Sequence, residues 1–168
     1  MARLTEVPIV RLNGRNAGPR RADRERPGMV MTDSRTDGQP ITVFLLDDHE
    51  MVRQELCDVL EAEPDIRVVG EAGTAASALA QVRTLRPDVA ILDVRLSDGD
   101  GIAVCREIRT QMPDTACLML TAYRDDRAAL AAIKAGCTGY MLKNIRGAAL
   151  PAAVRKVASG QLVLELDA

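Results

Sequence analysis

The sequence has little of what metal-binding fingers, disulfide scaffolds and membrane proteins require. It contains one histidine, and no two of its four cysteines form a C-x-x-C pair, which argues against zinc sites and disulfides. No apolar run is long enough to span a bilayer, and the arginine-containing N-terminus has no apolar signal core. These absences predict a cytoplasmic protein without a membrane partner, and the isolated thiols are predicted to be buried and reduced: Cys57, Cys105, Cys117 and Cys137.

Charge divides the chain into two parts. Residues 1–40 carry eight arginines against five acids, a net charge of +3, whereas residues 41–168 carry fourteen basic residues against nineteen acids, or −5. Residues 1–40 are interpreted as a disordered basic N-terminal tail, because they mix Arg, Gly, Pro and Asp without helical or strand periodicity. A solvated tail is favoured over a nucleic-acid contact, since aromatic residues and helical spacing are missing.

From residue 41 onward, short apolar runs alternate with helical patterns five times, which is typical of β-α units around a parallel sheet. Runs rich in Val, Ile and Leu suit strands that are covered on both faces. We therefore predict an α/β fold with a doubly wound, five-stranded parallel sheet, flavodoxin-like (βα)5, in the strand order 2-1-3-4-5. The predicted strands are Ile41–Leu46, Ile66–Glu71, Val89–Leu92, Ala116–Leu120 and Gly139–Leu142.

Four of these strands end in polar residues that a plain core does not explain. Because the carboxyl ends of parallel strands share one edge of the sheet, these side chains are expected to converge beside the third strand. Crowded carboxylates repel one another unless a cation shares their site, and hard oxygen ligands suit Mg²⁺. Each residue alone fits a cap or a turn, but together they predict phosphoryl transfer onto an aspartate: Asp47 and Asp48, then Asp93, Thr121 and Lys143.

Residues 41–160 resemble the receiver domain of two-component response regulators, and more closely the NarL/FixJ group with its DevR-like members. The resemblance rests on V-F-L-L-D-D-H-E, V-V-G-E-A-G, R-P-D-V-A-I-L-D-V-R-L, D-G-D-G-I, L-M-L-T-A-Y and A-G-C-T-G-Y-M-L-K. It implies a signalling domain rather than an enzyme, one that assists its own phosphorylation and dephosphorylation. A sensor histidine kinase is the implied phosphodonor, and homodimerisation on activation is implied as well.

The resemblance also implies a role for each site residue. Asp93 would be the phosphoacceptor, and Asp48 and Asp93 would bind Mg²⁺ together with the backbone carbonyl of Arg95, while Asp47 would act mainly through water. Lys143 would contact the phosphoryl group. The expected switch pair is Thr121 with Tyr140. Two further residues, Arg95 and Tyr123, are expected to shield the phosphoaspartate from water.

Two departures from the family pattern concern loops. Leu96-Ser97 stands where receivers often have Met-Pro, which leaves the loop after Asp93 less rigid. Asn144 stands where many receivers have a proline in a cis peptide, so the isomer of the Lys143–Asn144 bond is open, since a cis bond without proline costs about 3–4 kcal/mol.

Relatives usually continue into a helix-turn-helix DNA-binding domain, and this sequence has only residues 161–168 after its last helical pattern. DNA would thus be reached only through a missing C-terminal domain. The segment Q-L-V-L-E-L-D-A is interpreted as the start of a linker or a C-terminal tail, and its likeness to the linker favours a chain cut from a longer transcription factor over a stand-alone receiver.

Two rival functions remain open. A receiver-like interaction module that takes no phosphate is opposed by the full set of Asp, Thr and Lys residues. An aspartate-nucleophile Mg²⁺ phosphatase needs a second Asp two residues after the first, where this chain has Arg95. Nucleotide binding and cysteine phosphatase chemistry are disfavoured, because G-x-x-x-x-G-K-[ST], an early G-x-G-x-x-G and C-x5-R are missing.

Overall fold

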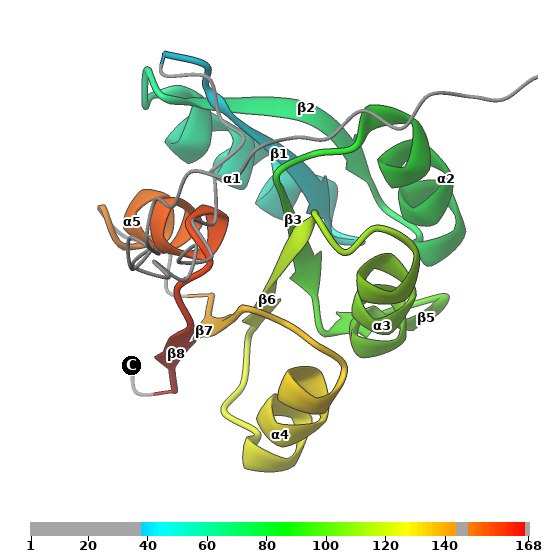
Figure 1. The fold of residues 1–168 in the computed structure, drawn as a ribbon. Coiled ribbons are helices and arrows are strands. Elements are labelled where there is room, and N and C mark those ends of the chain that lie inside the picture. The colour runs from blue at the N-terminus through cyan, green and yellow to red at the C-terminus, as the bar shows by residue number, and fades with distance from the viewer. Residues whose placement is uncertain (1–37, 144–147, 167–168) are drawn as a thin grey trace, which may run out of the picture. The chain divides into compact units, whose positions relative to one another are not determined.

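The structure, a computed structural model, describes residues 38–143 and 148–166. The predicted N-terminal tail therefore lies almost wholly outside the described residues, and so does the Lys143–Asn144 peptide bond. The strands alternate with five helices along the described chain (Figure 1). The helices are α1 (Glu50–Glu61), α2 (Ala75–Leu85), α3 (Gly101–Gln111), α4 (Asp126–Lys134) and α5 (Ala149–Ala158).

One parallel sheet holds six strands in the order β2-β1-β3-β6-β7-β8. The five predicted strands and their order are confirmed, and the structure adds β8 at the edge, from within the predicted C-terminal segment 161–168. A separate two-stranded hairpin of β4 and β5 follows β3. The strands are β1 (Ile41–Leu46), β2 (Ile66–Ala72), β3 (Val89–Asp93), β4 (Arg95–Leu96), β5 (Gly99–Asp100), β6 (Ala116–Thr121), β7 (Gly139–Leu142) and β8 (Val163–Glu165).

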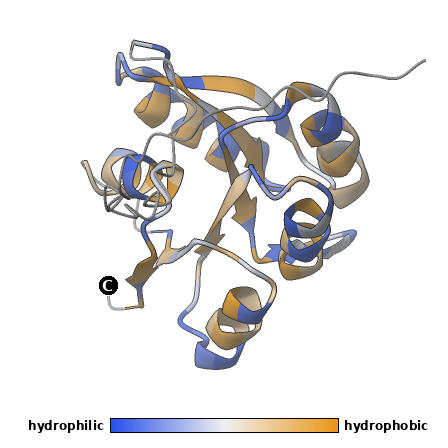
Figure 2. Ribbon diagram, viewed as in Figure 1, coloured by the Kyte–Doolittle hydropathy of each residue, from blue (hydrophilic) through white to orange (hydrophobic). Residues whose placement is uncertain are grey.

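Helices cover both faces of the sheet, as the apolar strands require. Successive side chains of a strand point to opposite faces, so Val43 and Leu45 pack with α1 and α5, whereas Phe44 and Leu46 pack with α2 and α3. Figure 1 shows α1 and α5 on one side of the sheet and α2, α3 and α4 on the other. The central strands are accordingly mostly apolar (Figure 2), and every residue of β3 is buried. The buried carboxylates of the described residues, Asp47 and Asp93, lie where β1 and β3 end.

Local sequence signals explain where several helices begin and end. Pro151 is the third residue of α5, in the first turn, where its missing N–H has no intrahelical partner to lose. Gly136 and Gly160 follow α4 and α5 with φ of 95° and 84°, values that favour glycine. Three of the cysteines are buried as predicted, but Cys57 on α1 is partly exposed.

No helix in the ranges 38–143 and 148–166 is both long and apolar enough to cross a membrane. The longest described helix, α1, has 12 residues and carries charged side chains along its length.

Gly101 sets the distance between α3 and the end of β3. Its N–H donates to the carbonyl oxygen of Val94, and a Cβ on Gly101 would lie 1.7 Å from the carbonyl oxygen of Asp93. We therefore expect Gly101→Ala to lower the free energy of unfolding by about 2–3 kcal/mol, because the backbone of β3 must shift. Urea denaturation followed by far-UV circular dichroism would measure the loss.

Gly99→Ala is the matched control, since its added Cβ would meet nothing nearer than the Cβ of Ala75 at 3.8 Å. Equal unfolding midpoints for the two variants would contradict the role given to Gly101.

Candidate functional site

Buried acidic side chains gather where β1 and β3 end. Asp47 follows β1, its side chain is 2% exposed, and its backbone N–H continues the sheet by donating to the carbonyl oxygen of Ala72 at 3.2 Å. Asp93 is the last residue of β3, and its side chain is 8% exposed. Because β1 and β3 are neighbours in the sheet, the two carboxylates lie at the same edge.

Lys143 joins these two carboxylates. It follows β7, two strands from β3, and its backbone N–H donates to the carbonyl oxygen of Thr121 at 2.7 Å. Its Nζ lies 2.6 Å from Oδ2 of Asp47 and 3.0 Å from Oδ2 of Asp93. The extended side chain thus closes the distance across β6 and places one ammonium between two buried carboxylates.

Asp48 and His49 complete a cluster of possible metal ligands. One ligand atom from each of Asp47, Asp48, His49 and Asp93 lies within 4.8 Å of the others. Asp48 Oδ2 accepts a hydrogen bond from the backbone N–H of Ser97 at 2.9 Å. Its Oδ1 is buried and accepts no hydrogen bond within the described chain, although Nδ1 of His49 lies 2.9 Å away in poor alignment.

A divalent cation fits this donor set. Buried polar atoms are nearly always hydrogen-bonded, and the unpartnered Asp48 Oδ1 beside two more carboxylates is an oxygen that a cation could bind. Carboxylate oxygens are hard ligands of the kind that Mg²⁺ takes, usually one or two of them with water and phosphate oxygens. The part of the chain that the structure describes therefore holds an acidic cluster able to bind a metal.

The pKa values reflect burial and charge in opposition. Burial raises the pKa of the Asp93 carboxyl above its ordinary value of 3.8, even though the hydrogen bond and charge of Lys143 act the other way. Burial alone would lower the pKa of the Lys143 ammonium, but its hydrogen bonds to Asp47 and Asp93 outweigh burial and raise it. The ammonium therefore stays charged at neutral pH.

Of the two predicted switch residues, Thr121 ends β6, the strand beside β3, and Tyr140 lies on β7 in the apolar core. The Thr121 hydroxyl donates to the carbonyl oxygen of Tyr123 at 3.1 Å, and no hydrogen bond of the described residues joins it to Asp93. The Tyr140 ring is fully buried. Its hydroxyl has no hydrogen-bond partner in the described ranges. Burial raises the pKa of the phenol, and the nearby Thr121 side chain, although not aligned for a hydrogen bond, acts in the opposite direction.

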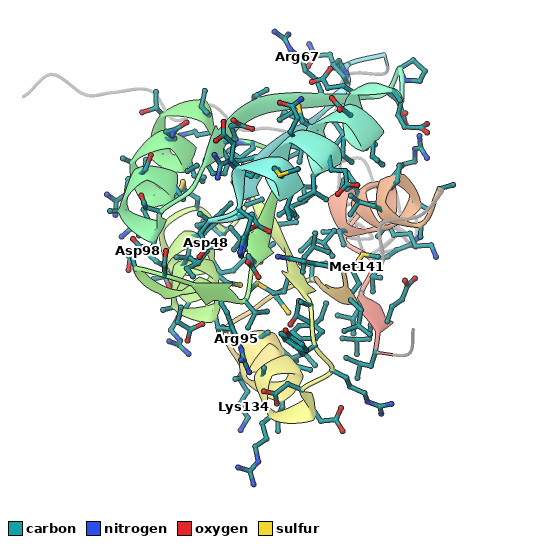
Figure 3. All side chains as sticks on the ribbon, turned by 180° about the vertical axis from the view of Figure 1, so that it is seen from behind. Asp48, Arg67, Arg95, Asp98, Lys134 and Met141 are labelled. Carbon is teal, nitrogen blue, oxygen red and sulfur yellow. The ribbon has the colours of Figure 1, made fainter. Side chains whose placement is uncertain are left out.

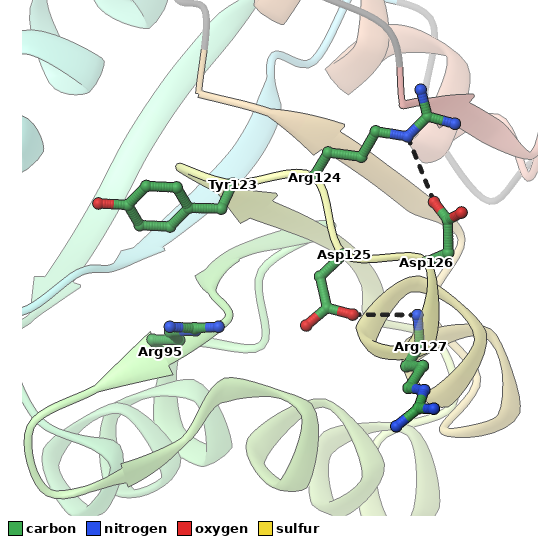
Figure 4. A pocket seen from close by; sticks show the side chains of 6 residues that line it. All are labelled: Arg95, Tyr123, Arg124, Asp125, Asp126 and Arg127. Atoms are coloured by element: carbon green, nitrogen blue, oxygen red, sulfur yellow. Dashed lines mark hydrogen bonds and ion pairs between the residues drawn. The ribbon is translucent and has the colours of Figure 1, made fainter.

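A shallow pocket opens beside the cluster between the β4 strand and the start of α4. Tyr123 extends toward Arg95, whose guanidinium carbon lies 5.9 Å from the centre of the ring (Figure 4). Asp125 caps α4 by accepting hydrogen bonds from the backbone N–H groups of Arg127 and Ala128. Tyr123 is 67% exposed and lines this pocket together with Arg95.

Sequence reasoning missed three groups that hold this site. The backbone N–H of Ser97 binds Asp48, the backbone N–H of His49 donates to Asp47 Oδ1 at 2.9 Å, and Nη1 of Arg53 donates to the carbonyl oxygen of Asp47 at 2.6 Å. Backbone donors leave no residue-type signal. Arg53 does, because it precedes the buried Leu56 and Leu60 of α1 by three and seven residues and thus puts a charge on the buried helix face.

The fold and the site together define a receiver domain. A family model described as the response regulator receiver domain matches residues 43–155, and the chain belongs to that family. The DNA-binding transcriptional activator DevR/DosR of Mycobacterium tuberculosis is 53% identical over 125 residues, which are 74% of this chain and 58% of that protein. Response regulator protein VraR of Staphylococcus aureus is 36% identical over 125 residues, which are 74% of this chain and 60% of VraR.

Solved structures agree with this assignment. A two-component response regulator of the LuxR family from Aurantimonas superposes with a TM-score of 0.71 at 30% identity, over 74% of this chain and 89% of that one. The signal receiver domain of a response regulator named NarL from Mycobacterium tuberculosis gives 0.70 at 30% identity, over 73% and 99%. The chain carries the receiver domain of a DevR/NarL-type response regulator, and it spans less than two thirds of the curated relatives.

The raised pKa of Asp93 predicts a pH-dependent stability difference. Its ionised form is disfavoured by folding, so the destabilisation is complete above the folded pKa and disappears below the ordinary value of 3.8. We expect Asp93→Asn to be more stable than the parent at pH 7 by on the order of 1 kcal/mol, a gain that shrinks as the pH falls toward 3.8. Urea denaturation in the presence of a chelator, at several pH values, would measure it.

Asp114→Asn is the control, since that exposed acid lies on the loop between α3 and β6. An Asp93→Asn variant less stable than the parent at pH 7 would contradict the dominance of burial over the Lys143 ion pair.

Proposed function

We propose that this receiver accepts a phosphoryl group from a sensor histidine kinase onto Asp93, in a Mg²⁺-dependent reaction, and changes conformation to control its output. The observation that carries the proposal is the Lys143 ammonium bound to both Asp47 and Asp93, at 2.6 and 3.0 Å, beside an acidic cluster with an unpartnered oxygen. A carboxylate nucleophile, a fixed cation and a set of metal ligands are what phosphoryl transfer to an aspartate needs.

In the proposed step an Asp93 oxygen attacks phosphorus as the P–N bond to the kinase histidine breaks. The electron pair of that bond stays on the imidazole nitrogen, and the Asp93 carboxylate becomes an acyl phosphate. Asp93 needs no general base, because a carboxylate is already ionised at neutral pH. Lys143 would release part of its contact with Asp93 and bind the phosphoryl oxygens, whose negative charge its ammonium neutralises.

Asp48, Asp93 and the backbone carbonyl of Arg95 would hold the metal ion, with Asp47 acting mainly through water. When bound, Mg²⁺ would neutralise further charge on the phosphoryl group and align it with Asp93. Asp47 suits an indirect role, because both of its carboxylate oxygens already accept hydrogen bonds, from His49 and from Lys143.

Thr121 and Tyr140 would report the phosphorylation. The Thr121 hydroxyl would leave the carbonyl oxygen of Tyr123 and turn to the phosphoryl group, with the buried Tyr140 ring behind it. We further propose that the output is transcription through a DNA-binding domain, with homodimerisation on activation. The relative named as a DNA-binding transcriptional activator, 53% identical over 125 residues, supports this output.

The central test is phosphorylation itself. Incubation of the protein with Mg²⁺ and a small phosphodonor, phosphoramidate, should add the mass of one phosphoryl group, and Asp93→Asn should abolish that gain because the nucleophile is removed. Intact-protein mass spectrometry would detect it. Asp114→Asn, an exposed acid outside the cluster, should be phosphorylated as the parent is.

Other outcomes would support the rival functions. A mass gain that survives in Asp93→Asn would place the acceptor elsewhere. No gain from phosphoramidate or from any histidine kinase would favour an interaction module, and turnover of added phosphoesters would favour a phosphatase.

Tyr123 is expected to lengthen the life of the phosphorylated state. Its ring lies 5.9 Å from the Arg95 guanidinium carbon, and we propose that these two side chains limit the access of water to the phosphorylated Asp93. Contacts of this kind at exposed positions contribute about 0.5–1 kcal/mol, so Tyr123→Ala should lose phosphate about 2- to 5-fold faster. The half-life of the phosphorylated protein, followed by mass spectrometry, would measure it.

Leu130→Ala is the matched control, because Leu130 is a large exposed side chain on α4 that does not line the pocket. Equal half-lives for Tyr123→Ala and the parent would show that the ring does not limit the access of water.

A further inference from the structure

Arg53 is an arginine on the buried face of a helix. Its side chain is 15% exposed, and it shares one face of α1 with the buried Leu56 and Leu60. Arginine is seldom buried to this extent unless it is paired, because removing its charge from water is costly. Its contacts should therefore explain why it is there.

The guanidinium binds backbone rather than a carboxylate of the site. Nη1 donates to the carbonyl oxygen of Asp47 at 2.6 Å, whereas Nε is buried without a hydrogen-bond partner in the described residues. The carboxylate of Glu71, which is half-exposed, lies 3.9 Å from Nε, too far for a hydrogen bond. The short bond to Asp47 is thus the principal polar contact of Arg53.

This bond completes the hydrogen bonding of the Asp47 backbone, whose N–H and carbonyl belong to the two successive peptide groups on either side of the residue. The N–H of Asp47 donates to Ala72 of β2 at 3.2 Å, and its carbonyl oxygen accepts from Arg53. The Asp47 carbonyl and the Asp48 N–H belong to one planar peptide group, so holding the carbonyl also fixes the direction in which Asp48 leaves the chain. Asp48 can then bind the Ser97 N–H with Oδ2 and keep Oδ1 unpartnered.

Gly73 provides the room for this contact. A Cβ on Gly73 would lie 3.1 Å from Nη1 of Arg53 and 3.8 Å from the carbonyl oxygen of Asp47. A methyl group at residue 73 would therefore displace the end of the Arg53 side chain without removing its charge. Two different residues, on α1 and after β2, thus protect the same hydrogen bond.

We propose that Arg53 is a positioning residue, which orients the Asp47–Asp48 peptide so that Asp48 can bind the divalent cation used in phosphorylation of Asp93. The inference rests on the function proposed above. The charge of Arg53 and its positioning role predict opposite effects on metal affinity when the residue is replaced. A cation near the acidic cluster repels a second cation, so loss of charge alone would tighten metal binding, whereas loss of the anchored peptide would weaken it.

The test measures metal affinity apart from phosphorylation. Binding of Mn²⁺, followed by electron paramagnetic resonance of the free ion with Mg²⁺ as competitor, gives the affinity for the parent protein and its variants. Arg53→Met should weaken Mn²⁺ binding about 10-fold, as loss of a group that orients a metal ligand typically does. The Mg²⁺ concentration for half-maximal phosphorylation by phosphoramidate should rise in proportion, with little change in the rate at saturating Mg²⁺.

Two further variants separate positioning from charge and from folding. Arg53→Lys keeps a charged donor and should recover most of the affinity. Gly73→Ala keeps Arg53 and its charge but crowds Nη1, and it should weaken Mn²⁺ binding as well. It also carries the test if Arg53→Met does not fold. Arg67→Met removes an exposed arginine at the far end of β2, distant from Asp48 (Figure 3), and should bind Mn²⁺ as the parent does.

Unchanged or tighter Mn²⁺ binding in folded Arg53→Met, or unchanged binding in Gly73→Ala, would overturn the positioning role. Asp48→Ala distinguishes this failure from a failure of the proposed function, because it removes the ligand itself. If Asp48→Ala binds Mn²⁺ as tightly as the parent, the cation site is not at Asp48, and the role of Arg53 falls with it.

Discussion

The Lys143 ammonium between Asp47 and Asp93 is the contact on which the site depends. Asp47, Asp48 and Asp93 crowd one edge of the sheet, and two of them are almost fully buried. Without a cation their mutual repulsion and the loss of hydration would oppose the ionised forms. Lys143 reaches them from β7, two strands away from β3, so the contact exists only if the strands stand in the order observed. The charge balance of the site thus depends on the strand order of the sheet.

The apolar core on both faces of the sheet leaves the strand ends as the place for buried charged side chains. Both faces of the sheet are covered, so β1 and β3 are almost wholly apolar as far as Leu46 and Leu92, and the buried charges of the described residues, Asp47 and Asp93, lie where these strands end. Gly101 brings α3 against the carbonyl oxygen of Asp93, and the backbone N–H of Val94 donates to the carbonyl oxygen of Leu120 on β6. Asp93 is therefore held by packing and backbone hydrogen bonds, while within residues 38–143 and 148–166 its carboxylate contacts the Lys143 ammonium and accepts a long hydrogen bond from the N–H of Arg95.

Much of the fold could be predicted from the pattern of apolar and polar residues in the sequence. Apolar runs such as Ile41–Leu46 are strands covered on both faces, and the five predicted strands and their order are those of the structure. The spacing of parallel strands was enough to expect Lys143 near Asp93, because a long side chain closes the remaining distance. β8 was missed because three residues of a short segment gain their stability from pairing with β7, which local sequence does not show.

The sequence predicted the functional side chains of the site but not the groups that hold them in place. Carboxylates, a hydroxyl and an ammonium at strand ends have a recognisable chemistry, whereas the backbone N–H groups of Ser97 and His49 are the same in any residue. Arg53 was visible as a charge on an apolar helix face, but its target is a backbone oxygen, which no pattern of residue types names. The contacts that orient the site are therefore the part of it that the sequence does not predict and the structure shows.

The two halves of the site differ in how firmly they are held. Asp47 is anchored by β2, α1 and β7, through Ala72, Arg53 and Lys143, all far from it along the chain or on another element. In the part of the chain that the structure describes, the Thr121 hydroxyl at the end of β6 bonds to the backbone of Tyr123 two residues on, and Tyr123 is largely exposed. Segments held by few buried contacts open at lower free energy than anchored ones. The described contacts therefore hold Asp47 more firmly than the Thr121 hydroxyl, so a rearrangement of the Thr121 side chain breaks fewer hydrogen bonds than a rearrangement of Asp47 would.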